Sequence, residues 1–170
     1  MEIKIEPVKN NEVHILADIS AKSFYDTFYQ QNSEEDMRLC LKENFTIDTL
    51  TNELRQPLNY FFFAKVKDGI AGYLKLSVSQ VPHETDALEI ARIYVAKEKI
   101  GSGIGKSLMD FAFSFARQYN KKMIWLGVWE HNLRAINFYN NYGFEKFGEH
   151  LFMVGNDAQT DWLMKKELNE

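Results

Sequence analysis

The chain has 170 residues, of which 45% are hydrophobic and 14% aromatic, and its net charge is -4; these values are typical of one globular domain over residues 1–170. The balance of 20 basic and 24 acidic residues argues against a nucleic-acid-binding protein, which usually carries a basic surface. A single cysteine, Cys40, excludes an intrachain disulfide and a cysteine-rich zinc site. The sequence shows no signal-peptide pattern and no apolar run of membrane-spanning length, so we expect a cytoplasmic protein with no membrane partner.

The first third of the chain is predicted to form one strand and three helices. Alternating apolar residues predict a strand over Glu2–Val8, and apolar residues at helical spacing predict a helix over Val13–Phe28. Ser33 is a suitable N-cap for a second helix. A third, short helix is expected over Asp48–Leu54, ending near Pro57.

The remainder is predicted to alternate between strands and helices, with hairpin turns at residues 67–69 and 155–157. The expected elements are strands over Leu58–Val66, Ile70–Val78 and Ala87–Val95, a helix over Ile104–Tyr119, a strand over Lys122–Val128, a helix over Asn132–Tyr142, and strands over Phe144–Val154 and Gln159–Leu168. This order predicts an α/β fold in which a mixed sheet carries helices on its faces.

A glycine-containing turn leads into the helix that begins at Ile104. Gly103 and Gly105 allow positive φ and a close approach of the backbone to a ligand. The first N–H groups of the helix and its dipole favour an anion such as a pyrophosphate, to which Lys106 and Ser107 could add a charge and a hydroxyl. A plain structural turn is the competing interpretation. The glycines are spaced as G-x-G-x-G and lie in the middle of the sequence, which does not fit a Rossmann dinucleotide fingerprint.

A second motif, NLRAINFYNNYGF, runs from Asn132 to Phe144. The two segments together resemble the cofactor-binding motifs of the GCN5-related N-acetyltransferase (GNAT) superfamily, Q/R-x-x-G-x-G/A and N-x-x-A-x-x-F-Y-x-x-x-G-F. Stretches such as LEIARIYV and QTDWLMKKEL make the chain similar, over nearly its whole length, to bacterial PaiA-type spermidine/spermine acetyltransferases. Ile100 stands where the first motif has Gln or Arg, so we expect weaker anchoring of the pyrophosphate.

The resemblance implies the GNAT fold, a mixed and mostly antiparallel central sheet that splays between two parallel strands, with helices on both faces. It implies acetyl-CoA as the donor, no metal, and a small-molecule amine, in the first place a polyamine such as spermidine or spermine, as the acceptor. The implied donor-binding residues are Ile93, Tyr94 and Val95 for the pantetheine arm, Gly101, Ser102, Gly103, Ile104, Gly105, Lys106 and Ser107 for the pyrophosphate, Asn132 for the arm, and Tyr139 near the sulfur.

Two residues are the expected catalytic groups. Tyr139 is expected to be the general acid that gives a proton to the leaving thiolate, and a core aromatic on an amphipathic helix is the competing interpretation. Glu89 is expected to be the general base, directly or through a water. Strict alternation places its side chain on the same side of the strand as Ile93 and Val95. An ion pair with Arg92 would also explain this charge in an apolar strand.

The acceptor site is expected around Tyr25, Glu34 and Trp129, because acids and aromatic rings suit a polyamine. Acids in the first turn of a helix also complement its dipole, which is the competing explanation for Glu34. The histidines show no metal-ligand spacing; they are His14, His83, His131 and His150.

Other functions stay open at this point. The acceptor could instead be a peptide amine or another small amine, and the domain could bind a CoA ester as a sensor without turnover. An NAD-dependent oxidoreductase is a more distant alternative. Members of the fold often pair through their late strands, so a homodimer is also open.

Overall fold

The computed structural model describes residues 1–78 and 86–168. Within these residues a seven-stranded sheet has the order β1-β2-β3-β4-β5-β7-β6. Neighbouring strands are antiparallel except β4 and β5, which are parallel. The strands are β1 (Lys4–Pro7), β2 (Asn59–Val66), β3 (Gly69–Val78), β4 (Ala87–Val95), β5 (Met123–Trp129), β6 (Glu145–Val154) and β7 (Asp157–Glu167).

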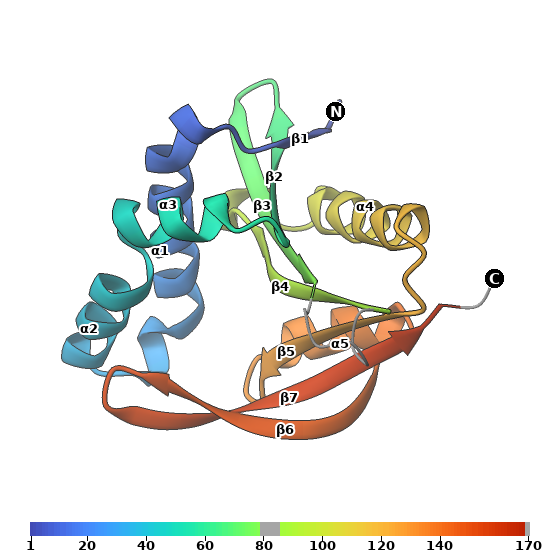
Figure 1. Ribbon diagram of the computed structural model, residues 1–170. Coiled ribbons are helices and arrows are strands. Elements are labelled where there is room, and N and C mark those ends of the chain that lie inside the picture. Colours follow the sequence, from blue (N-terminus) through green and yellow to red (C-terminus); the bar gives the residue numbers. More distant parts are fainter. Residues whose placement is uncertain (79–85, 169–170) are drawn as a thin grey trace.

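Helices cover both faces of this sheet (Figure 1). One face carries α1, α2 and α3, and the other carries α4 and α5. Their bounds are α1 Val13–Phe28, α2 Glu34–Asn44, α3 Ile47–Arg55, α4 Ile104–Gln118 and α5 Leu133–Asn141. The mixed α/β fold and its splayed, mostly antiparallel sheet are therefore confirmed.

The main hydrophobic core lies between the sheet and the helix pair α4 and α5. The inner face of α4 is fully buried at Leu108, Met109 and Ala112, against strand residues such as Leu74 and Leu88. Each large apolar side chain buried here stabilises the fold by roughly 1.5–3 kcal/mol. A second core beneath α1 and α3 holds Leu16, Leu50, Phe61, Phe63 and Tyr73. Each face of the sheet is thus packed against helices.

Helix caps explain where the N-terminal helices begin. The Ser33 hydroxyl accepts a hydrogen bond from the Asp36 N–H at 3.1 Å, as expected of an N-cap. Thr46 caps α3 in the same way, through the Thr49 N–H at 3.2 Å, so α3 begins one residue earlier than expected. The bounds of α1 and β4 are as predicted, and the other elements differ from expectation by at most two residues.

The hairpin of β6 and β7 turns more tightly than expected. Val154 pairs with Asp157, so the turn contains only Gly155 and Asn156, and Asp157 already belongs to β7. Gly155 has φ +60°, and the Asn156 N–H donates to the Asp36 carboxylate at 2.9 Å. The hairpin tip is therefore docked on the first turn of α2.

Candidate active site

The two parallel strands separate in the middle of the sheet. β4 and β5 pair from Ala87 opposite Met123 as far as Ile90 opposite Leu126, although both strands continue beyond that point. Pairing of β3 with β4 shifts at the same place, so that Ala91 is an extra residue in β4. Such a β-bulge bends its strand. A cavity of about 310 Å³ opens where the strands part.

The bulge also reverses which residues of β4 share a face. Glu89 lies opposite Ser77 and Ile93 lies opposite Leu74 on β3. Ser77 and Leu74 are three residues apart on a regular strand, so their side chains point to opposite faces. The expectation that Glu89 shares a side with Ile93 and Val95 is therefore wrong, because strict alternation did not allow for the inserted residue. Glu89 lies on the face that carries α1 to α3.

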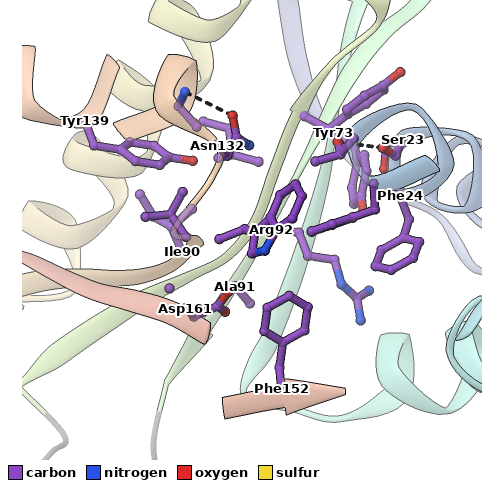
Figure 2. Close-up of a pocket in the computed structure, with 18 of the residues that line it drawn as sticks. Ser23, Phe24, Tyr73, Ile90, Ala91, Arg92, Asn132, Tyr139, Phe152 and Asp161 are labelled. Atoms are coloured by element: carbon purple, nitrogen blue, oxygen red, sulfur yellow. Dashed lines mark hydrogen bonds between the residues drawn. The ribbon is translucent and has the colours of Figure 1, made fainter. Parts of the chain in front are cut away.

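Aromatic rings form a large part of the cavity wall. They come from α1, β3, β4, β5, β6 and the segment between α2 and α3, and comprise Phe24, Phe28, Phe45, Tyr73, Tyr94, Trp129 and Phe152. The polar side chains among them include Arg92, Asn132, Tyr139 and Asp161. Figure 2 shows these groups converging from different elements. An apolar space with a few convergent polar groups is the usual form of a small-molecule site.

Tyr139 enters the cavity from α5. Its side chain is only 7% exposed, its ring packs edge-on against Phe144 at a centroid distance of 5.9 Å, and its hydroxyl points into the cavity (Figure 2). Burial raises the pKa of Tyr139 well above its ordinary value of 10. The phenol therefore keeps its proton throughout the neutral range. Tyr139 is a core aromatic and a cavity residue at once.

Asn132 stands where α5 begins. Its side-chain oxygen accepts a hydrogen bond from the Ala135 N–H at 3.3 Å, which makes it the N-cap of the helix. The same side chain lines the cavity. Capping uses the amide oxygen, and the amide nitrogen stays available as a donor.

The turn before α4 has the backbone expected of an anion cradle. Gly101 and Gly103 have φ values of +86° and +90°, and a Cβ at either would meet no atom within 4 Å. The first helical bond runs from the Ser107 N–H to the Gly103 carbonyl at 3.0 Å, which leaves the N–H groups of residues 104–106 without helical partners. The Lys106 ammonium lies 2.6 Å from the Asp110 carboxylate and so is already paired.

The other residues expected at the pyrophosphate differ in which of their groups are available to a ligand. The Ile104 side chain is fully buried in the core, so only its backbone faces outward. Gly105 lies beside the Phe138 ring, and the Ser102 hydroxyl donates to the Lys99 carbonyl. Ile100 is 40% exposed just before the turn. The groups that this turn can offer an anion are therefore backbone N–H groups.

Beyond Ile90, the edge of β4 that faces β5 has no strand partner among the described residues. Ile93, Tyr94 and Val95 pair only with β3 on the other side, and Ile93 and Tyr94 line the cavity. Their free backbone edge can pair with an extended amide-containing chain. The Tyr94 hydroxyl reaches away from this edge and donates to Asp26 at 3.4 Å.

The expected acceptor residues are not all brought together. Trp129 lines the cavity, with its ring 4.9 Å from that of Phe28. Tyr25 and Glu34 instead line a separate hollow formed by α1 and α2, with Glu35 among its other residues. Only Trp129 of the three shares a cavity with Tyr139.

Two features of the cavity were not identified from the sequence. Arg92 pairs with Glu53, its guanidinium nitrogens lying 3.0 and 3.2 Å from the carboxylate, and Lys75 binds the same carboxylate at 2.8 Å. The ion-pair partner of Arg92 is thus Glu53. Asp161, on β7, also lines the cavity. In the sequence, Asp161 is marked only as a charged residue directly before the apolar residues Trp162, Leu163 and Met164. It follows the two cofactor-binding motifs and belongs to neither of them.

Two findings on the described residues concern metal ligands and membrane-spanning helices. Among residues 1–78 and 86–168, no group of three or more His, Cys, Asp or Glu side chains could hold a metal ion. His83 lies outside the described residues. No helix in the described ranges is long and apolar enough to cross a membrane.

Comparison with known proteins identifies the class. The sequence model of the Acetyltransferase (GNAT) family matches residues 17–144, and the chain belongs to this family. It is 43% identical over 169 residues to an uncharacterised N-acetyltransferase of Lactobacillus delbrueckii subsp. lactis, covering 98% of each chain. The protein is an N-acetyltransferase that takes its acetyl group from acetyl-CoA.

More distant relatives agree in fold. The PaiA N-acetyltransferase from Thermoplasma acidophilum, solved in complex with coenzyme A, superposes with a TM-score of 0.82 at 21% identity, over 99% of this chain and 100% of that one. A spermidine N(1)-acetyltransferase of the same organism is 23% identical over 171 residues, 98% of each chain. The glycine turn, the free edge of β4 and the cavity where the sheet splays are features into which acetyl-CoA would fit.

Proposed function

We propose that the protein transfers the acetyl group to a primary amine of a small molecule, and that a polyamine such as spermidine or spermine is the acceptor. The observation that carries this proposal is the aromatic cavity at the splay, which contains a partly buried carboxylate, Asp161. Aromatic faces and carboxylates both attract an ammonium group. The names of the distant spermidine and spermine acetyltransferase relatives point the same way.

The charges around the cavity are compatible with a cationic acceptor. Arg92 and Lys75 are positive, but both are held by Glu53. Glu89 and Asp161 add two further carboxylates on the same side of the sheet. The three carboxylates therefore outnumber the two cations Arg92 and Lys75. For this reason the Arg92 guanidinium does not make the cavity repel an ammonium group.

On the donor side we assign binding to the residues of the cleft. The backbone of Ile93, Tyr94 and Val95 would pair with the amides of the pantetheine arm, and the N–H groups of residues 101–107 would hold the pyrophosphate. The Asn132 amide would donate to the arm. When bound, acetyl-CoA supplies an activated acyl carbon and a thiolate leaving group. A backbone N–H of β4 would stabilise the developing oxyanion.

Proton transfer needs a donor and an acceptor. The Tyr139 hydroxyl is buried, protonated and directed into the cavity, so we assign it the proton that the leaving sulfur receives. Glu89 is the base expected from the sequence. Burial raises its pKa, and Lys75, His150 and Arg92 partly offset that effect. Since Glu89 lies outside the cavity wall, it can act on the amine only through a water.

The test is release of CoA thiol from acetyl-CoA in the presence of spermidine, spermine, a panel of small amines and short peptides. Polyamine-dependent release by the wild-type protein, reduced about 100-fold or more in Tyr139→Phe, is the expected result. Tyr119→Phe is the matched control, because Tyr119 is 48% exposed at the far end of α4. Its activity should equal that of the wild type.

Two other outcomes would redirect the assignment. Release with peptides alone would favour a peptide amine, the acceptor suggested by a relative from Sulfurisphaera tokodaii named N-alpha-acetyltransferase, 28% identical over 131 residues. Tight acetyl-CoA binding without release for any acceptor would favour a CoA-ester sensor. Pairing of two copies through β6, the edge strand with exposed Leu151 and Met153, stays a prediction for sedimentation analysis.

A further inference from the structure

Asp161 occupies a position on the acceptor side of the cavity that no other carboxylate shares within the described residues. It pairs with Trp129 on β5 and with His150 on β6, so all three side chains project from the same face. The Asp161 side chain is 19% exposed and lines the cavity. Figure 2 shows Asp161 and Tyr139 approaching the cavity from different elements, β7 and α5.

A glycine makes room for this carboxylate. A Cβ at Gly127 would lie 3.1 Å from the Asp161 Oδ2 and 3.4 Å from the His150 Cε1. Because Gly127 has no side chain, both groups can lie over β5 at the point where it leaves β4. The carboxylate is thereby directed toward the splay.

The charges facing Asp161 leave it only weakly paired. The His150 Nε2 lies 3.7 Å from its Oδ2, and this is its one ion pair in the described part of the chain. On β4, Arg92 is bound to Glu53, and Glu89 is the other charged group near His150. Burial raises the pKa of Asp161 to about 6, and His150 opposes this rise. A cavity carboxylate that titrates this close to neutrality is suited to accept a proton.

His150 differs from Asp161 in its access to water. Its side chain is 47% exposed, whereas that of Asp161 is mostly buried. An imidazole ring can accept a proton at one nitrogen and release a proton from the other. The pair therefore connects the interior of the cavity to bulk water.

We propose that Asp161 binds the ammonium group of the acceptor and takes its first proton, and that His150 is a positioning residue that passes this proton to solvent. The inference rests on the proposed amine acetylation. The acceptor nitrogen starts with three protons. One goes to Asp161, one reaches the CoA sulfur through Tyr139, and one stays on the amide, while the N–C bond forms and the C–S bond breaks.

The experiment compares the pH dependence of kcat/KM for the best amine in the wild type, Asp161→Asn and Glu89→Gln. An enzyme that uses ionised Asp161 to deprotonate a bound ammonium should have a kcat/KM that is nearly flat between about pH 6.5 and 9. Without that base the amine must arrive neutral, so Asp161→Asn should lose about 100-fold or more at pH 7 and rise about tenfold per pH unit. Glu89→Gln tests the other carboxylate on this face of the sheet, because the slope should appear only in the variant that lacks the base.

Controls separate this role from a structural one. Glu145→Gln makes the same kind of charge change at an exposed position of β6 and should leave the profile unchanged. Acetyl-CoA affinity should be retained in Asp161→Asn, and its melting temperature should not fall. His150→Ala should be slow in dilute buffer and regain rate when imidazole is added, which a loss of packing would not produce.

The outcomes are distinguishable. A flat profile that persists in Asp161→Asn, with wild-type turnover intact, would overturn this inference and leave the proposed function standing. A profile that becomes steep in Glu89→Gln instead would assign the base to Glu89 and also overturn it. Absence of thiol release by the wild type with every acceptor would overturn both proposals together.

Discussion

Replacing Gly155 by alanine should destabilise the protein through the hairpin that carries the acceptor side of the site. Gly155 has φ +60°, and a Cβ there would lie 2.4 Å from the Cα of Asp36. Ordinary contacts between carbon atoms are about 3.5–4.0 Å, so the tip of the hairpin must move by about 1 Å or more. That displacement would break the hydrogen bond from the Asn156 N–H to the Asp36 carboxylate.

The cost can be worked out from these contacts. A left-handed conformation costs alanine about 1 kcal/mol, and a hydrogen bond to a charged group is worth about 1.5–3 kcal/mol. The sum is about 2.5–4 kcal/mol, which lowers the melting temperature of a protein of this size by about 5–16 °C. Gly101 is the matched control, because it has φ +86° but open space around it. Gly101→Ala should cost only about 1 kcal/mol.

Thermal unfolding of the ligand-free variants, followed by circular dichroism, measures both effects. Equal losses in Gly155→Ala and Gly101→Ala would refute the reasoning, because they would mean that backbone strain alone matters and that docking of the hairpin on α2 contributes nothing. A larger loss at Gly155 would show that this contact holds β6 and β7 in place.

Three further predictions concern charge. Burial opposes ionisation of Glu53, but Arg92 and Lys75 outweigh it and hold its pKa below the ordinary 4.5; this stabilisation exists above pH 4.5 and is lost as the pH falls through the lowered pKa. In urea unfolding, Glu53→Gln should therefore cost about 2–4 kcal/mol at pH 7 and little at pH 3, and an equal loss at both would contradict the ion-pair explanation. The pKa of Asp161 is raised by burial to about 6 from 3.8, so the folded state binds this proton more tightly than the unfolded chain and stability falls as the pH rises between these values. Asp161→Asn should consequently gain about 1–2 kcal/mol at pH 8, after allowance for solvent screening, and nothing at pH 3.5. Ile100→Arg should tighten acetyl-CoA binding about three- to tenfold at low salt in calorimetry, whereas Ile100→Met should not, and a gain that survives high salt would argue against a phosphate contact.

The residues that we propose for the two substrates come from different faces of the sheet. Asn132 and Tyr139 come from the side of the sheet covered by α4 and α5, and Trp129 and Asp161 come from the side covered by α1 to α3. The two groups meet only where β4 and β5 part. A donor held along β4 and an amine entering from the opposite side would thus react at the splay, away from most of the solvent.

Sequence patterns predicted the glycine turn and the Asn132 cap correctly, because the signals for both are local. The positive φ values at residues 101 and 103 and the cap at Asn132 depend on the backbone of only a few neighbouring residues. Such local conformations can be predicted from turn and capping residues in the sequence. The three residues expected around the acceptor do not share one cavity. Tyr25 and Glu34 face a separate hollow, since helical spacing gives the face of a helix but not the neighbour it packs against.

The sequence by itself determined the order of the elements, their bounds to within two residues, and the motifs that identify the family. These features follow from hydrophobic periodicity and from capping and turn residues, which act over short stretches of chain. Only the tertiary structure decided the bulge at Ala91, the face of Glu89 and the arrival of Asp161 and His150 beside Gly127. Each of these depends on strand register between segments far apart in sequence, and a shift of one residue in register moves a side chain to the opposite face of the sheet.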